Sequence, residues 1–229
     1  MANGPDGSTR QWWQVFPLVR RLSDRLTPLL LPLPITPNQV SVASLLSGLA
    51  GAACFLPGGR GVAMTGGLLM IASYVLDNCD GDIARAKKLS SRLGHYLDSV
   101  VDWLVDTAFF VCLGIGTAAA RDEMLWLWLG LAAALGATIS YVLELSHDVR
   151  AARRTQAAPE KPVEQSELPT DWKEAFVYVF RELSRADFCF IVLVLAAFDV
   201  TWVLLVAGAI GAQVYWLTSL FVGWRRFHV

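Results

Sequence analysis

Apolar runs long enough to cross a lipid bilayer take up most of this chain, and they restrict it to a bundle of membrane helices. A helix needs about 20 residues to cross the hydrocarbon core. Hydrophobic residues make up 55% of the 229 residues, whereas soluble domains contain about 45–50%. The sequence therefore predicts an all-α integral membrane protein.

Six membrane helices account for these runs. We expect them at residues 38–56, from 62 into the segment around 80, at 94–117, at 124–147, and twice within 188–224. The turn-forming sequence Pro57-Gly58-Gly59 ends the first run. The last block is too long for one span and Asp199 interrupts it, so we expect two helices joined by a tight turn.

Positive charge is concentrated on one side of this predicted bundle. With six spans, 17 of the 19 Lys and Arg residues fall on the side that carries both ends of the chain, and only Arg60 and Arg121 fall on the other. Loops rich in Lys and Arg remain in the cytoplasm. We therefore expect a multi-pass protein of the cell (inner or cytoplasmic) membrane, with both termini and the segments around residues 85–92 and 148–182 facing the cytoplasm.

The first 37 residues differ from the rest in pattern. Residues 9–31 mix aromatic and aliphatic side chains with arginines, which predicts an amphipathic helix in the headgroup layer, interrupted near Pro17 and Pro28. The polar opening lacks the pattern of a cleavable signal peptide. We expect residues 1–37 to form a cytoplasmic tail and this interfacial helix.

Residues 38–229 are expected to form one six-helix membrane domain without an internal repeat. Its polar stretch at about 148–182 predicts a flexible cytoplasmic connection, and the spacing of apolar residues predicts a surface helix over 171–183. The four cysteines form no C-x-x-C pair, so we interpret them as packing residues. A net charge of −1 gives no preference for polyanions, and we expect no nucleic-acid partner.

Four aspartates form part of a strict pattern in and between the second and third runs. The pattern is D-x-x-D-G-x-x-A-R, eight residues, then G-x-x-x-D-x-x-x-D, and its positions are Asp77, Asp80, Gly81, Ala84, Arg85, Gly94, Asp98 and Asp102. An ionisable group at the centre of a membrane helix costs about 2.5–3.5 kcal/mol. One or two such acids could form a structural polar cluster, but four in this pattern indicate a functional site.

Helical spacing brings the acids together as oxygen ligands. Asp77 and Asp80 share one face of their helix, and Asp98 and Asp102 share a face of the next. Hard carboxylate ligands without His or Cys favour Mg²⁺ or Mn²⁺ over Zn²⁺, and four of them suit two ions. The small residues Gly81, Ala84 and Gly94 leave room for a bulky ligand to approach the backbone.

Four neighbours of the pattern are interpreted separately. Cys79 and His95 fall off the acidic faces, so we expect neither to be a ligand. Asp82 is expected to point away from the acidic face. Asp106, one turn beyond Asp102, is a candidate to interact with the metal ligands without binding the metal itself.

The pattern is the signature of the CDP-alcohol phosphotransferase family, which this chain resembles over about residues 18–118. The resemblance implies transfer of a substituted phosphate from a CDP-linked donor, such as CDP-diacylglycerol or a CDP-alcohol, to the hydroxyl of an acceptor alcohol. CMP is released, and the product belongs to phospholipid or phosphodiester biosynthesis. Family resemblance also implies a homodimer in the lipid bilayer.

The same resemblance implies a role for each matching residue. Asp77, Asp80 and Asp98 are implied to be metal ligands, and Asp102 to be the general base and a further ligand. Contacts with the CDP donor are implied for residues of the pattern and of two flanking stretches: Asn38, Ser41, Gly81, Ala84, Arg85, Ser91 and Gly94.

The acceptor alcohol is left open by the sequence. Five arginines gather near the expected active face: Arg150, Arg153, Arg154, Arg181 and Arg185. They could bind a phosphorylated polyol such as inositol phosphate or glycerol phosphate, with Arg150, Arg153 and Arg185 as the candidates. The interpretation that we prefer is that they follow the positive-inside rule and contact anionic lipid. The arginines that lead into Thr36-Pro37-Asn38 resemble those of family members that handle inositol phosphates.

Other functions remain as alternatives to a CDP-alcohol phosphotransferase. A prenyltransferase also binds diphosphate through membrane aspartates and Mg²⁺, although its acidic motifs lie in two separated helix pairs. A cation channel, a carrier or a catalytically inactive membrane homologue that binds cations would use the acids without chemistry. CMP release from a CDP-alcohol distinguishes these functions.

Overall fold

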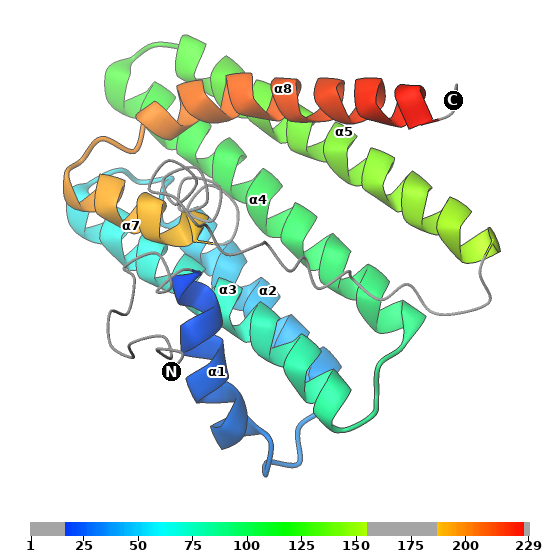
Figure 1. Ribbon diagram of the computed structural model, residues 1–229. Helices are drawn as coiled ribbons and strands as arrows, with labels where there is room; N and C mark the ends of the chain where they lie inside the picture. The colour runs from blue at the N-terminus through cyan, green and yellow to red at the C-terminus, as the bar shows by residue number, and fades with distance from the viewer. Residues whose placement is uncertain (1–16, 155–186, 227–229) are drawn as a thin grey trace, which may run out of the picture.

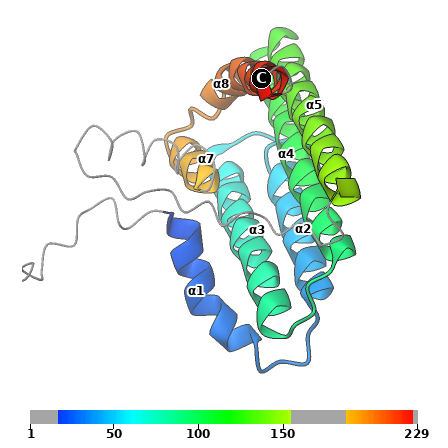
Figure 2. The ribbon, with the colours of Figure 1, turned by 45° about the vertical axis from the view of Figure 1, so that its right-hand side comes forward.

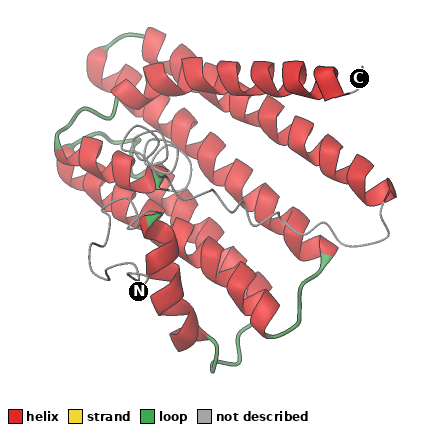
Figure 3. Cartoon of the chain, in the orientation of Figure 1, coloured by secondary structure: helices red, strands yellow, loops and turns green. Residues whose placement is uncertain are grey.

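The computed structural model describes residues 17–154 and 187–226, and all regular structure in these ranges is helical (Figures 1 and 3). The helices are α1 (Leu18–Leu30), α2 (Pro37–Ala53), α3 (Arg60–Ala86), α4 (Arg92–Arg121), α5 (Leu125–Arg154), α7 (Phe188–Ala197) and α8 (Val203–Arg226). The all-α prediction is confirmed for these residues. The predicted surface helix at 171–183 and the residues before 17 lie outside them.

Among the described residues, three helices are long and apolar enough to cross a membrane, and they extend over Arg60–Ala86, Leu93–Arg121 and Leu125–Ser146. α2 has 17 residues, and the apolar parts of α7 and α8 are shorter still, at Phe188–Ala197 and Val203–Leu217. The chain is thus a multi-pass membrane protein with three candidate spans and further apolar helices. The count of six spans stays a prediction.

Most predicted helix limits agree with the structure to within a few residues. α2 begins at a capping box in which the Thr36 side chain accepts the N–H of Gln39 while the Gln39 side chain accepts the N–H of Thr36. The two apolar helices near the end of the chain separate where expected, because Asp199 adopts a left-handed conformation with a φ of 59°. α5 continues through Arg154, past the predicted limit near residue 147, because no Gly or Pro interrupts this Ala- and Arg-rich stretch.

The predicted break at Pro28 is wrong, since α1 runs through this residue to Leu30. Proline removes one intrahelical donor, but the next turn still forms: the N–H of Leu31 donates to the Thr27 carbonyl over 2.9 Å. Val19, Ser23 and Thr27 are buried on one face of α1, and that face packs against α3. The predicted break near Pro17 stays a prediction, because the residues before it lie outside the described part of the chain.

A buried carboxylate from far along the chain caps the first turn of α1. Asp187 accepts the N–H of Leu18 over 2.6 Å and the N–H of Val19 over 2.8 Å. These are donors that the helix itself leaves unsatisfied. Burial raises the pKa of the Asp187 carboxyl, while the N–H groups of Val19 and Leu18 lower it. The start of α7 is thereby joined to the start of α1.

α2, α3 and α4 form the centre of the bundle, with α1 and α7 beside α3, α5 beside α4, and α8 lying across α5 (Figures 1 and 2). Small residues let α2 and α3 approach closely: a Cβ on Gly66 would lie 2.8 Å from the Gly51 carbonyl oxygen. Ser44 and Ser73 hydrogen-bond to each other's carbonyls, each over 2.9 Å. This close contact fixes the register between α2 and the acidic end of α3.

Candidate metal and donor site

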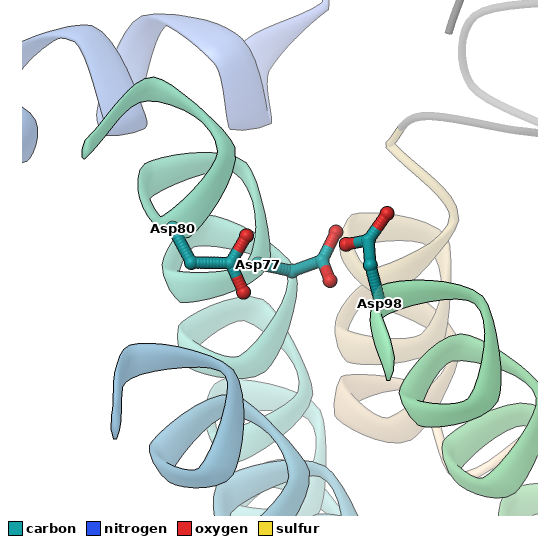
Figure 4. Close-up of side chains that lie close together, drawn as sticks. All are labelled: Asp77, Asp80 and Asp98. Carbon is teal, nitrogen blue, oxygen red and sulfur yellow. The ribbon is translucent and has the colours of Figure 1, made fainter. Parts of the chain in front are cut away.

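Three of the four pattern aspartates converge between α3 and α4 (Figure 4). Asp77 and Asp80 extend from α3 and Asp98 from α4, and one carboxylate oxygen from each lies within 4.8 Å of the others. Asp80 is buried, while Asp77 and Asp98 are half-buried. Helical spacing on α3 and the adjacency of α3 and α4 around the 87–91 turn produce this cluster.

The cluster has the chemistry of a divalent-cation site. Oxygen ligands on opposite sides of an octahedral Mg²⁺ lie about 4.2 Å apart, given bonds of about 2.1 Å, so small side-chain movements would bring these three carboxylates onto one ion. Like charges this close repel one another in a low-dielectric setting. A hard cation would remove that repulsion, and the all-oxygen donor set fits Mg²⁺ or Mn²⁺.

α2 contributes to the site through Ser41. The Ser41 hydroxyl donates to Oδ2 of Asp80 over 2.5 Å, and both side chains are buried. In Figure 4 the carboxylate of Asp80 points toward Asp77. Ser41, predicted as a donor contact, thus lies against a predicted metal ligand.

The fourth aspartate stands apart from the cluster. Asp102 lies one turn beyond Asp98 on α4, is exposed, and does not belong to the group of three. One further turn along α4, Asp106 accepts a hydrogen bond from the Tyr74 hydroxyl over 3.1 Å. Asp106 therefore forms a polar contact between α3 and α4 beyond the cluster and is not one of its members.

Cys79 and His95 do not join the carboxylate cluster either. Cys79 is buried, and its thiol donates to the Ser23 carbonyl of α1 over 3.8 Å. All four cysteines are free thiols, in agreement with their interpretation as packing residues.

The predicted donor contacts lie at the same end of the bundle as the acids. The three atoms nearest to a Cβ on Gly81 would all belong to the guanidinium of Arg85, the first at 3.4 Å, so this side chain lies over Gly81. Ser91 caps α4 by accepting the N–H of Gly94 over 3.0 Å, which gives Ser91 a structural role. Asn38 is exposed in the first turn of α2, and Ala84 lies one turn beyond Asp80 on α3.

Two residues without a predicted role complete this surface. Asp82 accepts hydrogen bonds from Arg85 over 2.6 Å and from Arg20 of α1 over 3.1 Å. The i, i+3 spacing of Asp82 and Arg85 on one helix could have indicated their pairing. No local signal indicates the contact with Arg20, because it joins residues that are far apart in the sequence.

The predicted acceptor residues cannot be compared with the cluster. Arg150 and Arg153 belong to the last turns of α5, but their side chains lie outside the described part of the structure, and so does Arg185. Their assignment to acceptor phosphate or to lipid stays a prediction.

Comparisons with known proteins show which family most of this chain matches. Residues 34–213 match the family model of the CDP-alcohol phosphatidyltransferases. A bifunctional IPC transferase and DIPP synthase of Thermococcus kodakarensis is 37% identical over 129 residues, which cover 56% of this chain and 28% of that protein. An archaetidylinositol phosphate synthase of Pyrococcus horikoshii is 30% identical over 109 residues, 48% of this chain and 56% of that protein.

A solved structure has the same fold at low sequence identity. The apo phosphatidylinositol phosphate synthase of Mycobacterium tuberculosis superposes with a TM-score of 0.51 and 20% identity, over 86% of this chain and 95% of that one. The curated relatives are longer than the region they share with this chain, which spans 28% and 56% of the two relatives named above.

Proposed function

We propose, from the premise that this chain belongs to the CDP-alcohol phosphatidyltransferase family, that it is an enzyme that transfers a substituted phosphate from a CDP-linked donor to an alcohol and releases CMP. The convergence of Asp77, Asp80 and Asp98 between α3 and α4 is the observation that carries this proposal. An oxygen-only cluster suits a reaction in which two linked phosphates must be held and their charge offset.

Each side chain of the site takes a role that its position supports. Asp77, Asp80 and Asp98 hold Mg²⁺ or Mn²⁺, with Asp102 as a further ligand when a second ion binds. A bound cation would offset the charge of the diphosphate and of the departing CMP. Ser41 orients Asp80 by its hydrogen bond, and Arg85 binds a donor phosphate.

Asp102 acts as the general base that takes the proton of the acceptor hydroxyl. Its exposed position, one turn from Asp98, leaves it accessible to an incoming alcohol. A carboxylate is a weak base toward an alcohol, so proton removal accompanies attack on the phosphorus and does not precede it. Asn38, Gly81, Ala84, Ser91 and Gly94 form the surface along which the donor lies.

A phosphorylated polyol is the acceptor that we favour. One relative is an archaetidylinositol phosphate synthase, and Arg150, Arg153 and Arg185 are available by topology to bind an acceptor phosphate. Inositol phosphate is the first candidate and glycerol phosphate the second. CDP-diacylglycerol and other CDP-alcohols are the candidate donors.

The membrane arrangement follows from charge and helix length. We propose six spans within one domain at 38–229, with both termini and the carboxylate cluster on the cytoplasmic side and α1 in the headgroup layer. Arg60 and Arg121 lie at the ends of α3 and α4 away from the cluster, which supports this orientation. A homodimer is proposed from family resemblance.

The test is CMP release by the purified protein from a panel of CDP-linked donors and alcohols, with the lipid or phosphodiester product identified by mass spectrometry. The reaction should require one acceptor class, and Asp102→Asn should reduce release by about 100-fold or more, as loss of a general base does. Release of diphosphate from a prenyl donor would favour the prenyltransferase alternative. Metal binding without any CMP release would favour the inactive homologue that binds cations.

A further inference from the structure

We propose that Asp82 is a positioning residue of the donor site, which holds the guanidinium of Arg85 over Gly81 and is itself held by Arg20 of α1. The inference rests on the proposed function, because it assumes that Arg85 meets the phosphates of a CDP-linked donor. It gives a role to an aspartate that lies inside the acidic pattern without being one of its defining positions. It also gives α1 a contact with the donor site.

The position of the Arg85 side chain is the first observation. Its side chain is 65% exposed, and a long exposed arginine samples many rotamers unless a partner holds it. Nη2 of Arg85 lies 2.6 Å from Oδ1 of Asp82. Nη1 and Nη2 lie 3.4 and 3.6 Å from the place where a Cβ of Gly81 would be. The guanidinium is therefore held above the open backbone of Gly81, which is the surface expected to meet the donor.

A pairing with Asp82 still leaves Arg85 able to bind a phosphate. A guanidinium has five N–H donors in a planar fork, and a bidentate phosphate contact uses two of them. The described contact with Asp82 is made through Nη2 alone. Asp82 thus fixes one edge of the fork and turns the rest toward the donor surface.

Burial and charge explain why Asp82 stays in place. The Asp82 side chain is only 14% exposed, and Nη1 of Arg20 lies 3.1 Å from each of its carboxylate oxygens. Arg20 is also paired with Asp24 one turn further along α1, over 3.2 Å. The side chains of Asp24, Arg20, Asp82 and Arg85 thus form a row of alternating charge from α1 to α3. A network of this kind orients its members better than one exposed pair does.

The direction in which Asp82→Asn changes the affinity for the donor distinguishes a positioning role from a purely electrostatic effect of the charge. Asp82 is an anion beside a site for an anionic ligand, so its field alone weakens donor binding, and Asp82→Asn would then tighten it. If Asp82 instead positions Arg85, the same substitution weakens binding. The loss should be about three- to tenfold, the range expected when one partner of an oriented charge pair is removed.

The experiment measures the dissociation constant of CDP, used as the probe, by titration calorimetry on the full chain in detergent with Mg²⁺. We expect Asp82→Asn to weaken CDP binding, Asp82→Glu to restore part of the affinity, and Arg85→Gln to weaken binding at least as much as Asp82→Asn. In the Arg85→Gln background, Asp82→Asn should have no further effect, because contacting residues are not additive. Asp122→Asn is the control: it removes one carboxylate beyond the far end of α4, outside this network, and should leave CDP binding unchanged.

The outcomes distinguish the two proposals. Equal or tighter CDP binding by Asp82→Asn would overturn the positioning role and leave the proposed function intact. The positioning role is also overturned if Asp82→Asn weakens binding by an equal factor with and without Arg85, as a purely structural role would predict. If Asp82→Asn does not fold, Asp82→Glu decides alone, since unchanged affinity would contradict a geometric role. Absence of CDP binding by the unaltered protein would overturn the proposed function, and the role of Asp82 with it.

Discussion

At the scale of single residues, the position of Asp80 depends on a hydroxyl from a different helix. Ser41 of α2 donates to one oxygen of Asp80, and the same carboxylate belongs to the cluster with Asp77 and Asp98 (Figure 4). A hydrogen bond behind a ligand fixes its orientation and tunes its affinity for metal. The site is thus assembled by α2, α3 and α4 together.

Substitution of Ser41 tests this dependence. Ser41→Ala should weaken Mn²⁺ binding by about 10- to 100-fold, as loss of such a supporting contact does, because it leaves a buried oxygen of Asp80 without its donor. Titration of the purified protein followed by electron paramagnetic resonance measures the affinity. Ser47→Ala is the control, since Ser47 lies further along α2, away from the acids, and donates to the Leu69 carbonyl. Equal effects of the two substitutions would mean that Ser41 acts only on stability.

At the scale of helices, close approach of α2 and α3 determines where the acids lie. The backbones meet at Gly51 and Gly66, where added methyl groups would contact the opposing carbonyl oxygens at 3.0 and 2.8 Å. Packing of small residues is the usual source of helix association within a bilayer. The opposite end of each helix then carries Ser41 and Asp80 to hydrogen-bonding distance.

Enlargement of Gly66 should separate these helices. Gly66→Ala is expected to destabilise the protein by about 1–3 kcal/mol through overpacking, because its Cβ would meet backbone that cannot move aside easily. Thermal unfolding in detergent measures the change. Gly61→Ala, on the same helix and with no atom within 4 Å of the added Cβ, should leave the melting temperature unchanged or raise it. A Gly66→Ala variant as stable as Gly61→Ala would show that the α2–α3 contact is not tight.

Helix limits and the acidic cluster could be predicted from the sequence because local signals encode them. Thr36 and Pro37 start α2, the residues Pro57 to Gly59 follow it, and regular spacing aligns Asp77 with Asp80. Long-range contacts carry no such signal. The capping of α1 by Asp187 and the pairing of Arg20 with Asp82 depend on how helices pack, and so does the absence of Asp102 from the group of three aspartates.

At the scale of the whole molecule, the two ends of the bundle differ in chemistry. The cluster and its arginines lie at one end, and at the other the guanidinium of Arg121 lies over the rings of Trp126 and Trp202, 4.6 and 4.8 Å from their centroids. Tryptophans of this kind mark the boundary between bilayer and water. The contact joins the end of α4 to the starts of α5 and α8, away from the acids.

Reporter fusions test the proposed orientation. Alkaline phosphatase, which is active only outside the cytoplasm, should be inactive when fused after Lys88 and active when fused after Glu123, because these turns lie at opposite ends of α4. A fluorescent protein that matures in the cytoplasm should give the reverse result at each point. Phosphatase activity after Lys88 would place the acidic end outside and contradict the positive-inside assignment.

The most direct measurement of the central claim is CMP release from a CDP-linked donor as Mg²⁺ or Mn²⁺ is added, with the unaltered protein beside Asp98→Asn. Asp98 is the ligand that α4 adds to the two of α3. Release should begin only when the cation is added, and Asp98→Asn should reduce it by about 100-fold or more, since the cation offsets the charge of the diphosphate. Release in the presence of a chelator, or equal release by the two proteins, would contradict a catalytic metal site between α3 and α4.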